Sequence, residues 1–216
     1  MKDILKKIKK TIIRNRFIGY FFVFEEARFN LRLIWSIFVN ALYITANLIF
    51  SFVYKDGFVL SVSLYYFLLL AMRWYLFRAE RGYVPNRHRA PLYVGVLLFL
   101  TAIAMGAVIS RTLAEGIQKS YSPFAVIPQA LFVLYSISGA LIRLSSHKPS
   151  TGICFFGVDA ISLSAALFSI FNLVNFLSHA NPVAFDYRAA FAAGVCASTV
   201  TLLLAVSLLL KSESTE

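Results

Sequence analysis

Residues 33–54 read LIWSIFVNALYITANLIFSFVY, and after Lys55, Asp56 and Gly57 the chain continues with FVLSVSLYYFLLLAMRWYLF over residues 58–77. Each run holds roughly the 20 mainly apolar residues that a helix needs to cross a hydrocarbon core about 30 Å thick. The polar break between the runs is so short that the two helices must be antiparallel neighbours. This stretch therefore predicts a hairpin of two transmembrane helices.

Further apolar runs of similar length follow the hairpin. They lie at about 91–110, 124–144, 152–179 and 188–210, with polar loops between them. Of the 216 residues, 59% are apolar and 14% are charged, and the mean hydropathy is +0.74. A soluble domain is only about half apolar and about a quarter charged. We therefore expect an all-α, polytopic membrane helix bundle with about six transmembrane helices.

The start of the chain differs from the rest. Ile4, Leu5, Ile8 and Ile12 share one helical face, and lysine and arginine fill most of the other positions. This pattern predicts an amphipathic helix that lies in the membrane interface. We therefore divide the chain into a basic interfacial segment at 1–32, a transmembrane domain at 33–210 and a cytoplasmic tail at 211–216. The expected partners are the bilayer, anionic lipids at the basic segment, and a second copy or another membrane protein.

The distribution of basic residues predicts the orientation, since cytoplasmic loops accumulate Lys and Arg. With the N-terminus inside, most of the 21 basic residues lie on the cytoplasmic side. The exceptions are Lys55, Arg111, Lys119, Arg188 and the intramembrane Arg73. Both termini are therefore expected in the cytoplasm. The net charge of +11 is then a topology signal, and we expect no nucleic-acid binding.

The first span carries a polar stripe. Its members recur at steps of three and four residues, which places them on one helical face; they are Ser36, Asn40, Tyr43, Asn47, Ser51 and Tyr54. Polar groups are costly in hydrocarbon, so this face must meet another helix or water. Interhelical hydrogen bonding accounts for the stripe without any activity, because Asn and Ser commonly serve as packing contacts in membranes.

The fifth span is the most polar, with residues at helical steps that drift slowly around the axis; they are Asp159, Ser162, Ser169, Asn172, Asn175 and His179. In the second span Tyr66 and Arg73 lie on roughly one side. Arg73 and Asp159 both fall in the inner third of the bilayer, where each charge is costly alone. The sequence therefore predicts a buried ion pair between them.

Arg73 and Asp159 could also be accommodated without this ion pair. Arg73 lies near the cytoplasmic end of its span and could extend to that interface. Asp159 could be a protonated acid bound by neighbouring hydroxyls, or a titrating carboxylate in a proton or cation path. The candidate residues for a ligand or ion pathway are Asp159, Arg73, Asn40, Asn47, Tyr66, Asn172 and Asn175.

The familiar signatures of enzymes and metal sites are missing from the sequence. It has no phosphate-binding glycine loop, no HExxH motif and no nucleophile elbow. The three histidines are scattered, and Cys154 and Cys196 both fall in apolar runs. We therefore expect no metal, no cofactor and no catalytic residue.

One stretch of the chain resembles a known group of proteins. Residues 46–77, ANLIFSFVYKDGFVLSVSLYYFLLLAMRWYLF, with Tyr65, Tyr66, the Met72-Arg73 step and Gly194 in the last span, resemble a family of uncharacterised six-span membrane proteins of Gram-positive bacteria. The resemblance implies a bacterial cytoplasmic membrane and six spans. It implies no particular activity.

Two functions remain open on these grounds. The two polar stripes and the buried charges favour a small solute or ion transporter or channel, with a polar site between the first, second and fifth spans. The alternative is a non-catalytic accessory protein that binds anionic lipid or another subunit. An enzyme acting on lipid is the least favoured function.

Overall fold

The computed structural model describes residues 25–81, 83, 89–115, 123–145, 153–181 and 187–213. Within these ranges it contains six helices that are long and apolar enough to cross a membrane. This confirms the prediction of an all-α, six-span membrane bundle. The interfacial helix predicted at the start of the chain lies outside the described residues, and residues 25–32 belong to the first described helix.

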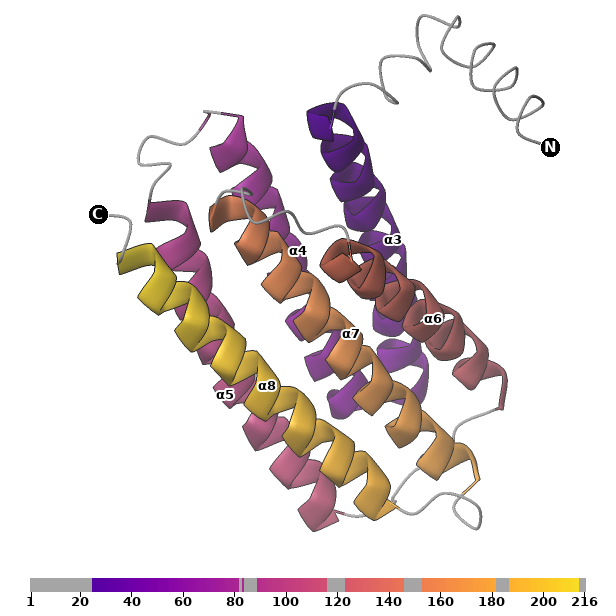
Figure 1. Cartoon of the computed structure of the whole chain (residues 1–216). Coiled ribbons are helices and arrows are strands. Elements are labelled where there is room, and N and C mark those ends of the chain that lie inside the picture. Colours follow the sequence, from indigo (N-terminus) through magenta and orange to yellow (C-terminus); the bar gives the residue numbers. More distant parts are fainter. Residues whose placement is uncertain are drawn as a thin grey trace, which may run out of the picture. The chain divides into compact units, whose positions relative to one another are not determined.

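The helices follow one another in the predicted order (Figure 1). They are α3 at Glu25–Tyr54, α4 at Gly57–Glu80, α5 at Ala90–Glu115, α6 at Pro123–Ser145, α7 at Ile153–Ala180 and α8 at Tyr187–Glu213. Most of them extend a few residues beyond the apolar runs, so that α8 includes Lys211 and Ser212 of the expected tail.

The chain forms two compact units, residues 1–39 and residues 40–216. The described part of the first unit is the beginning of α3, where the rings of Trp35 and Phe38 lie 5.8 Å apart and both side chains are exposed. The second unit holds the remainder of α3 together with α4 to α8. It contains all the contacts described below.

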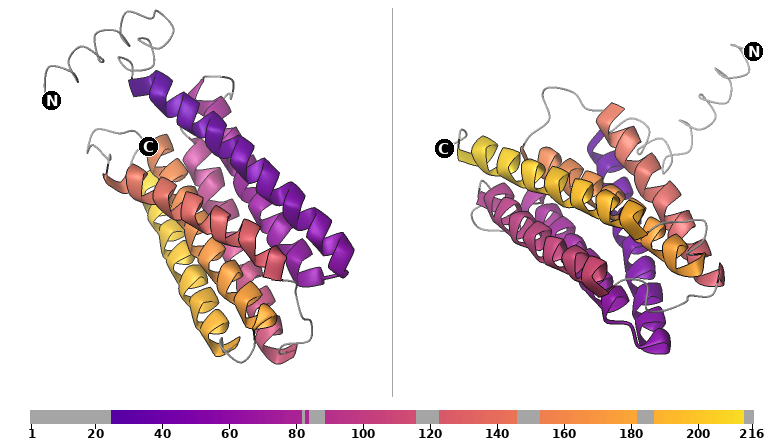
Figure 2. Two further views of the ribbon diagram at one scale, coloured as in Figure 1. Left: turned by 90° about the vertical axis from the view of Figure 1, so that its right-hand side faces the viewer. Right: turned by 90° about the horizontal axis from the view of Figure 1, so that it is seen from below.

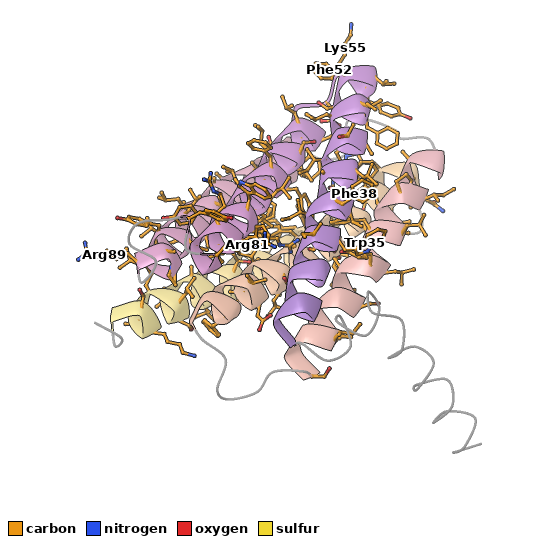
Figure 3. All side chains as sticks on the ribbon, turned by 90° about the horizontal axis from the view of Figure 1, so that it is seen from above. Trp35, Phe38, Phe52, Lys55, Arg81 and Arg89 are labelled. Atoms are coloured by element: carbon orange, nitrogen blue, oxygen red, sulfur yellow. The ribbon has the colours of Figure 1, made fainter. Side chains whose placement is uncertain are left out.

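The turn between α3 and α4 shows why the hairpin forms where the sequence predicts it. Lys55 has a φ of 49°, and the amide of Asp56 donates to the carbonyl of Ser51 at 3.0 Å. This is the left-handed closure that commonly ends a helix. The Asp56 carboxylate then accepts from the amide of Phe58 at 2.8 Å and caps α4. Figure 3 shows Phe52 and Lys55 together at this end of α3.

Helix α7 is the central helix of the second unit. It packs along α6 and α8 and also contacts α4 and α5, and Figures 1 and 2 show it between α6 and α8. It is also the most deeply buried of the six spans. The part of α3 in this unit has little close backbone packing with the other helices and joins them through long side chains.

Helices α5 and α8 lie side by side (Figure 2) and share the most extensive contact of any pair of described helices. A methyl group placed on Gly194 of α8 would lie 3.0 Å from side-chain atoms of Ile109, and one on Gly95 of α5 would lie 2.9 Å from Leu209. Gly194 therefore faces three atoms of the Ile109 side chain at close range, whereas Gly95 faces the flexible end of Leu209.

Candidate functional site

The polar residues of α7 face the interior of the bundle. Asp159 is half-buried, and the others that the sequence singles out are buried; they are Ser162, Ser169, Asn172, Asn175 and His179. Such residues are costly in a membrane unless they meet partners. The contacts of α7 therefore show where polar groups gather in this protein.

Four side chains from three helices form a hydrogen-bonded network at the level of Asn172. Asn172 Nδ2 donates to the Tyr43 hydroxyl at 2.7 Å and to Gln129 Oε1 at 2.8 Å. The Tyr43 hydroxyl donates to the same Gln129 oxygen. Gln129 Nε2 donates to Asn47 Oδ1 at 3.0 Å. We call Tyr43, Asn47, Gln129 and Asn172 the amide–tyrosine network.

The network is buried and is fixed to the backbone at one end. Asn47 Nδ2 donates to the backbone carbonyl of Tyr43 at 2.9 Å, one turn earlier in α3. Asn47 and Asn172 have no exposed surface, and Gln129 is 1% exposed. Hydrogen bonds between amides in such surroundings hold the three helices in one register.

Aromatic rings frame the network. The ring of Tyr43 stacks on that of Phe132, with ring centroids 3.6 Å apart and planes 6° apart. Tyr66 of α4 packs edge-on against both rings, at 4.9 Å from Tyr43 and 5.3 Å from Phe132. Because the rings exclude water from one side of the network, its hydrogen bonds lie in a low dielectric.

Further polar contacts follow one another along α7 toward its beginning. The Ser136 and Ser169 hydroxyls lie 2.6 Å apart. The Tyr66 hydroxyl donates to the backbone carbonyl of Ala165 at 3.1 Å. The Arg73 guanidinium donates to the Ser162 hydroxyl at 3.5 Å. Helices α3, α4 and α6 thus each meet the polar face of α7, at successive depths.

Arg73 is buried, with 3% of its surface exposed, and it donates toward α7. Its acceptor, Ser162, follows Asp159 by three residues on the same helix. The Arg73 side chain therefore reaches the turn of α7 that carries Asp159. The ion pair between Arg73 and Asp159 stays a prediction.

The structure brings some of the predicted pathway residues together and leaves others apart. Asn47 and Asn172 belong to the amide–tyrosine network, and Tyr66 belongs to its aromatic frame. Arg73 contacts the Asp159 end of α7. Asn175 lies one turn beyond Asn172 and is 2% exposed, and Asn40 of α3 is also 2% exposed.

The sequence did not single out Gln129, and Tyr43 appeared only as one member of a stripe. Gln129 brings α6, the fourth span, into a site that was expected between the first, second and fifth spans. A lone Gln inside the apolar run 124–144 was the available signal, since a buried amide in hydrocarbon needs a partner.

Among the described residues, no three His, Cys, Asp or Glu side chains lie close enough to hold a metal ion. No protein-family model matches the chain, and a search of curated proteins finds no relative. The predicted family resemblance therefore stays a prediction. The spans and the network describe a multi-pass membrane protein with a buried polar network.

Proposed function

We propose that this protein is a transporter or channel for a small solute or ion, and that its pathway follows the polar face of α7. The observation that carries the proposal is the succession of polar contacts at Ser162, Ala165, Ser169 and Asn172. At about 1.5 Å per residue this stretch covers about 15 Å, roughly half the thickness of the hydrocarbon core.

A succession of contacts suits passage better than adhesion alone. Apolar packing of small residues, or one or two polar contacts, is enough to hold membrane helices together. Each additional buried polar group raises the cost of placing the chain in hydrocarbon. Groups at several depths offer a permeating molecule hydrogen bonds that replace those it gives up to water.

One observation favours a second function. The members of the amide–tyrosine network bond directly to one another, as they do in an interface that only holds helices together. This arrangement fits a non-catalytic accessory protein. Its partners would be anionic lipids at the basic segment 1–32 or another membrane subunit, including a second copy.

We also propose placement in a bacterial cytoplasmic membrane with both termini in the cytoplasm. The support is the distribution of basic residues, which lie mainly in the segments assigned to that side.

The deciding experiment is flux into liposomes that contain the purified protein, with protons, alkali cations, halides and small neutral solutes as probes. We expect protein-dependent flux of one class of probe. Asn172→Leu keeps the branching and the number of side-chain heavy atoms but removes the amide, and Asp159→Asn removes the acid. We expect Asn172→Leu to reduce the flux about tenfold, which is the effect of losing about one hydrogen bond. We expect Asp159→Asn to reduce the flux as well.

The matched control is Ser207→Ala. Ser207 is exposed on α8 and its hydroxyl donates to the carbonyl of Leu203 in its own helix at 2.8 Å, so its loss should leave the flux unchanged. If the folded protein carries none of the probes, the transport proposal is wrong and the accessory function takes its place.

A further inference from the structure

The hydrogen bonds of the amide–tyrosine network have one consistent direction. A backbone carbonyl can only accept, so the Asn47 group next to the carbonyl of Tyr43 must be its NH₂. Asn47 therefore presents its oxygen to Gln129, and the NH₂ group of Gln129 must donate to that oxygen. The oxygen of Gln129 then faces Tyr43 and Asn172, and both of them donate to it.

This direction determines which atom of Asn172 is left over. Its NH₂ group is committed to Tyr43 and Gln129. Its oxygen, Oδ1, is buried and has no hydrogen-bond partner among the described residues. Exchanging the two atoms would set the oxygen of Asn172 against the oxygen of Gln129, so the neighbouring groups themselves fix the orientation of this amide.

A second unpartnered group lies one turn away on α7. Asn175 is 2% exposed, and its Nδ2 has no hydrogen-bond partner within the described part of the chain. Side chains three residues apart on a helix are neighbours. The acceptor of Asn172 and the donor of Asn175 therefore lie one turn apart on the same buried face of α7, where leaving either of them without a partner is costly.

We infer that the permeating solute is a small neutral molecule with a hydrogen-bond donor beside an acceptor, such as a primary amide or urea, and that Asn172 Oδ1 and Asn175 Nδ2 bind it. This inference rests on the proposed transport function and names its substrate class. The amide–tyrosine network and Asn175 offer dipoles and no formal charge. An ion that loses its water needs a compensating charge or several coordinating groups of one sign, whereas one acceptor and one donor match an amide.

The test compares acetamide and urea with N,N-dimethylacetamide, which keeps the carbonyl acceptor but has no N–H donor. Light scattering after rapid mixing follows the swelling of liposomes, with protein-free liposomes as the background. We expect protein-dependent entry of acetamide and urea and none of N,N-dimethylacetamide. Asn172→Leu should lower the protein-dependent entry of acetamide about tenfold, and Ser207→Ala should leave it unchanged.

Because Asn172→Leu also removes two bonds of the network, Asn175→Leu is the second variant. Its NH₂ group bonds no described residue, so the change should spare the fold and still reduce acetamide entry. Circular dichroism and gel filtration of each variant check that it is folded.

The outcomes separate this inference from the proposed function. Ion flux that Asn172→Leu abolishes, without protein-dependent acetamide entry, overturns the inference and leaves transport standing. Water permeation without acetamide entry also overturns it, since water alone would then occupy the site. Equal protein-dependent entry of acetamide and N,N-dimethylacetamide would show that the solute needs no N–H donor, and this result also overturns the inference. No protein-dependent flux of any probe overturns both.

Discussion

At the scale of single residues, Lys55 is the only non-glycine residue with a positive φ in the described ranges. It occupies the position after a helix where glycine is most common, because the left-handed conformation brings a Cβ atom too close to the backbone. The hydrogen bonds of Asp56 to Ser51 and Phe58 hold Lys55 in this conformation.

We therefore predict that Lys55→Gly raises the free energy of unfolding by about 0.5–1 kcal/mol. Lys55→Ala keeps the Cβ atom and removes only the charge, so it should bring no such gain. Unfolding of the two variants in mixed micelles, followed by circular dichroism, measures the difference. Equal stability of the glycine and alanine variants would show that the conformation of this turn carries no strain.

Single residues also show what the sequence could reveal about the site. Asn47 and Asn172 were found because an amide in an apolar run is costly and therefore conspicuous. Gln129 is equally costly but stands without a polar stripe, and nothing in its neighbourhood indicates a partner in α3. The partners of Asn47 and Asn172 depend on the register between helices, which one sequence does not contain.

At the scale of helices, Gly106 of α5 and Gly194 of α8 look alike in sequence but differ in their packing. Each is flanked by small residues at a spacing of four, which predicts a face for close helix packing. Gly194 is in close contact with Ile109, but a methyl group on Gly106 would meet no atom within 4 Å. The spacing predicts both faces equally, whereas only the structure shows that α8 uses Gly194.

We predict that Gly194→Ala destabilises the protein by about 1–3 kcal/mol, since the packed Ile109 side chain must shift to admit the methyl group. Gly106→Ala adds the same methyl group in open space and should be neutral, or stabilising by up to about 1 kcal/mol through helix propensity. Titration with a denaturing detergent compares the two variants. A larger loss for Gly106→Ala than for Gly194→Ala would contradict the packing described here.

The existence and order of the helices could be predicted from the sequence, because length and apolar composition alone determine which segments can cross a bilayer. Their arrangement could not. The central position of α7 follows from contacts with α4, α5, α6 and α8, and its polar composition indicated only that it needed partners.

At the scale of the molecule, basic residues mark the two ends of the second unit. At one end the Arg81 guanidinium lies 4.3 Å from the centre of the Phe77 ring, and Lys211 Nζ lies 4.7 Å from that of Phe156. Leu76, close to this end of α4, contacts Gly157 near the start of α7. The ends of α4 and α8 and the start of α7 therefore share one side, and Lys55 lies at the opposite end of α4.

The proposed orientation predicts how cysteines at these two ends react. In a variant with Cys154 and Cys196 replaced by serine, Lys55→Cys should react with a membrane-impermeant maleimide on intact cells. Arg81→Cys should react only after the cells are permeabilised. The reverse pattern would invert the topology. Labelling of both cysteines on intact cells would place both ends of α4 outside the cell, which contradicts a single crossing by this helix.

The sequence distance between the members of the amide–tyrosine network has a consequence for how the protein is made. Tyr43 and Asn172 are 129 residues apart, and Asn47 and Gln129 are 82 residues apart. At about 5–20 residues per second, a ribosome needs on the order of ten seconds to add the missing partner. During that interval α3 is already synthesised, but the Asn47 amide oxygen and the Tyr43 hydroxyl lack the partners they meet in the folded protein. A chain that ends before α7 therefore leaves the Tyr43 hydroxyl without the Asn172 amide that donates to it in the folded protein.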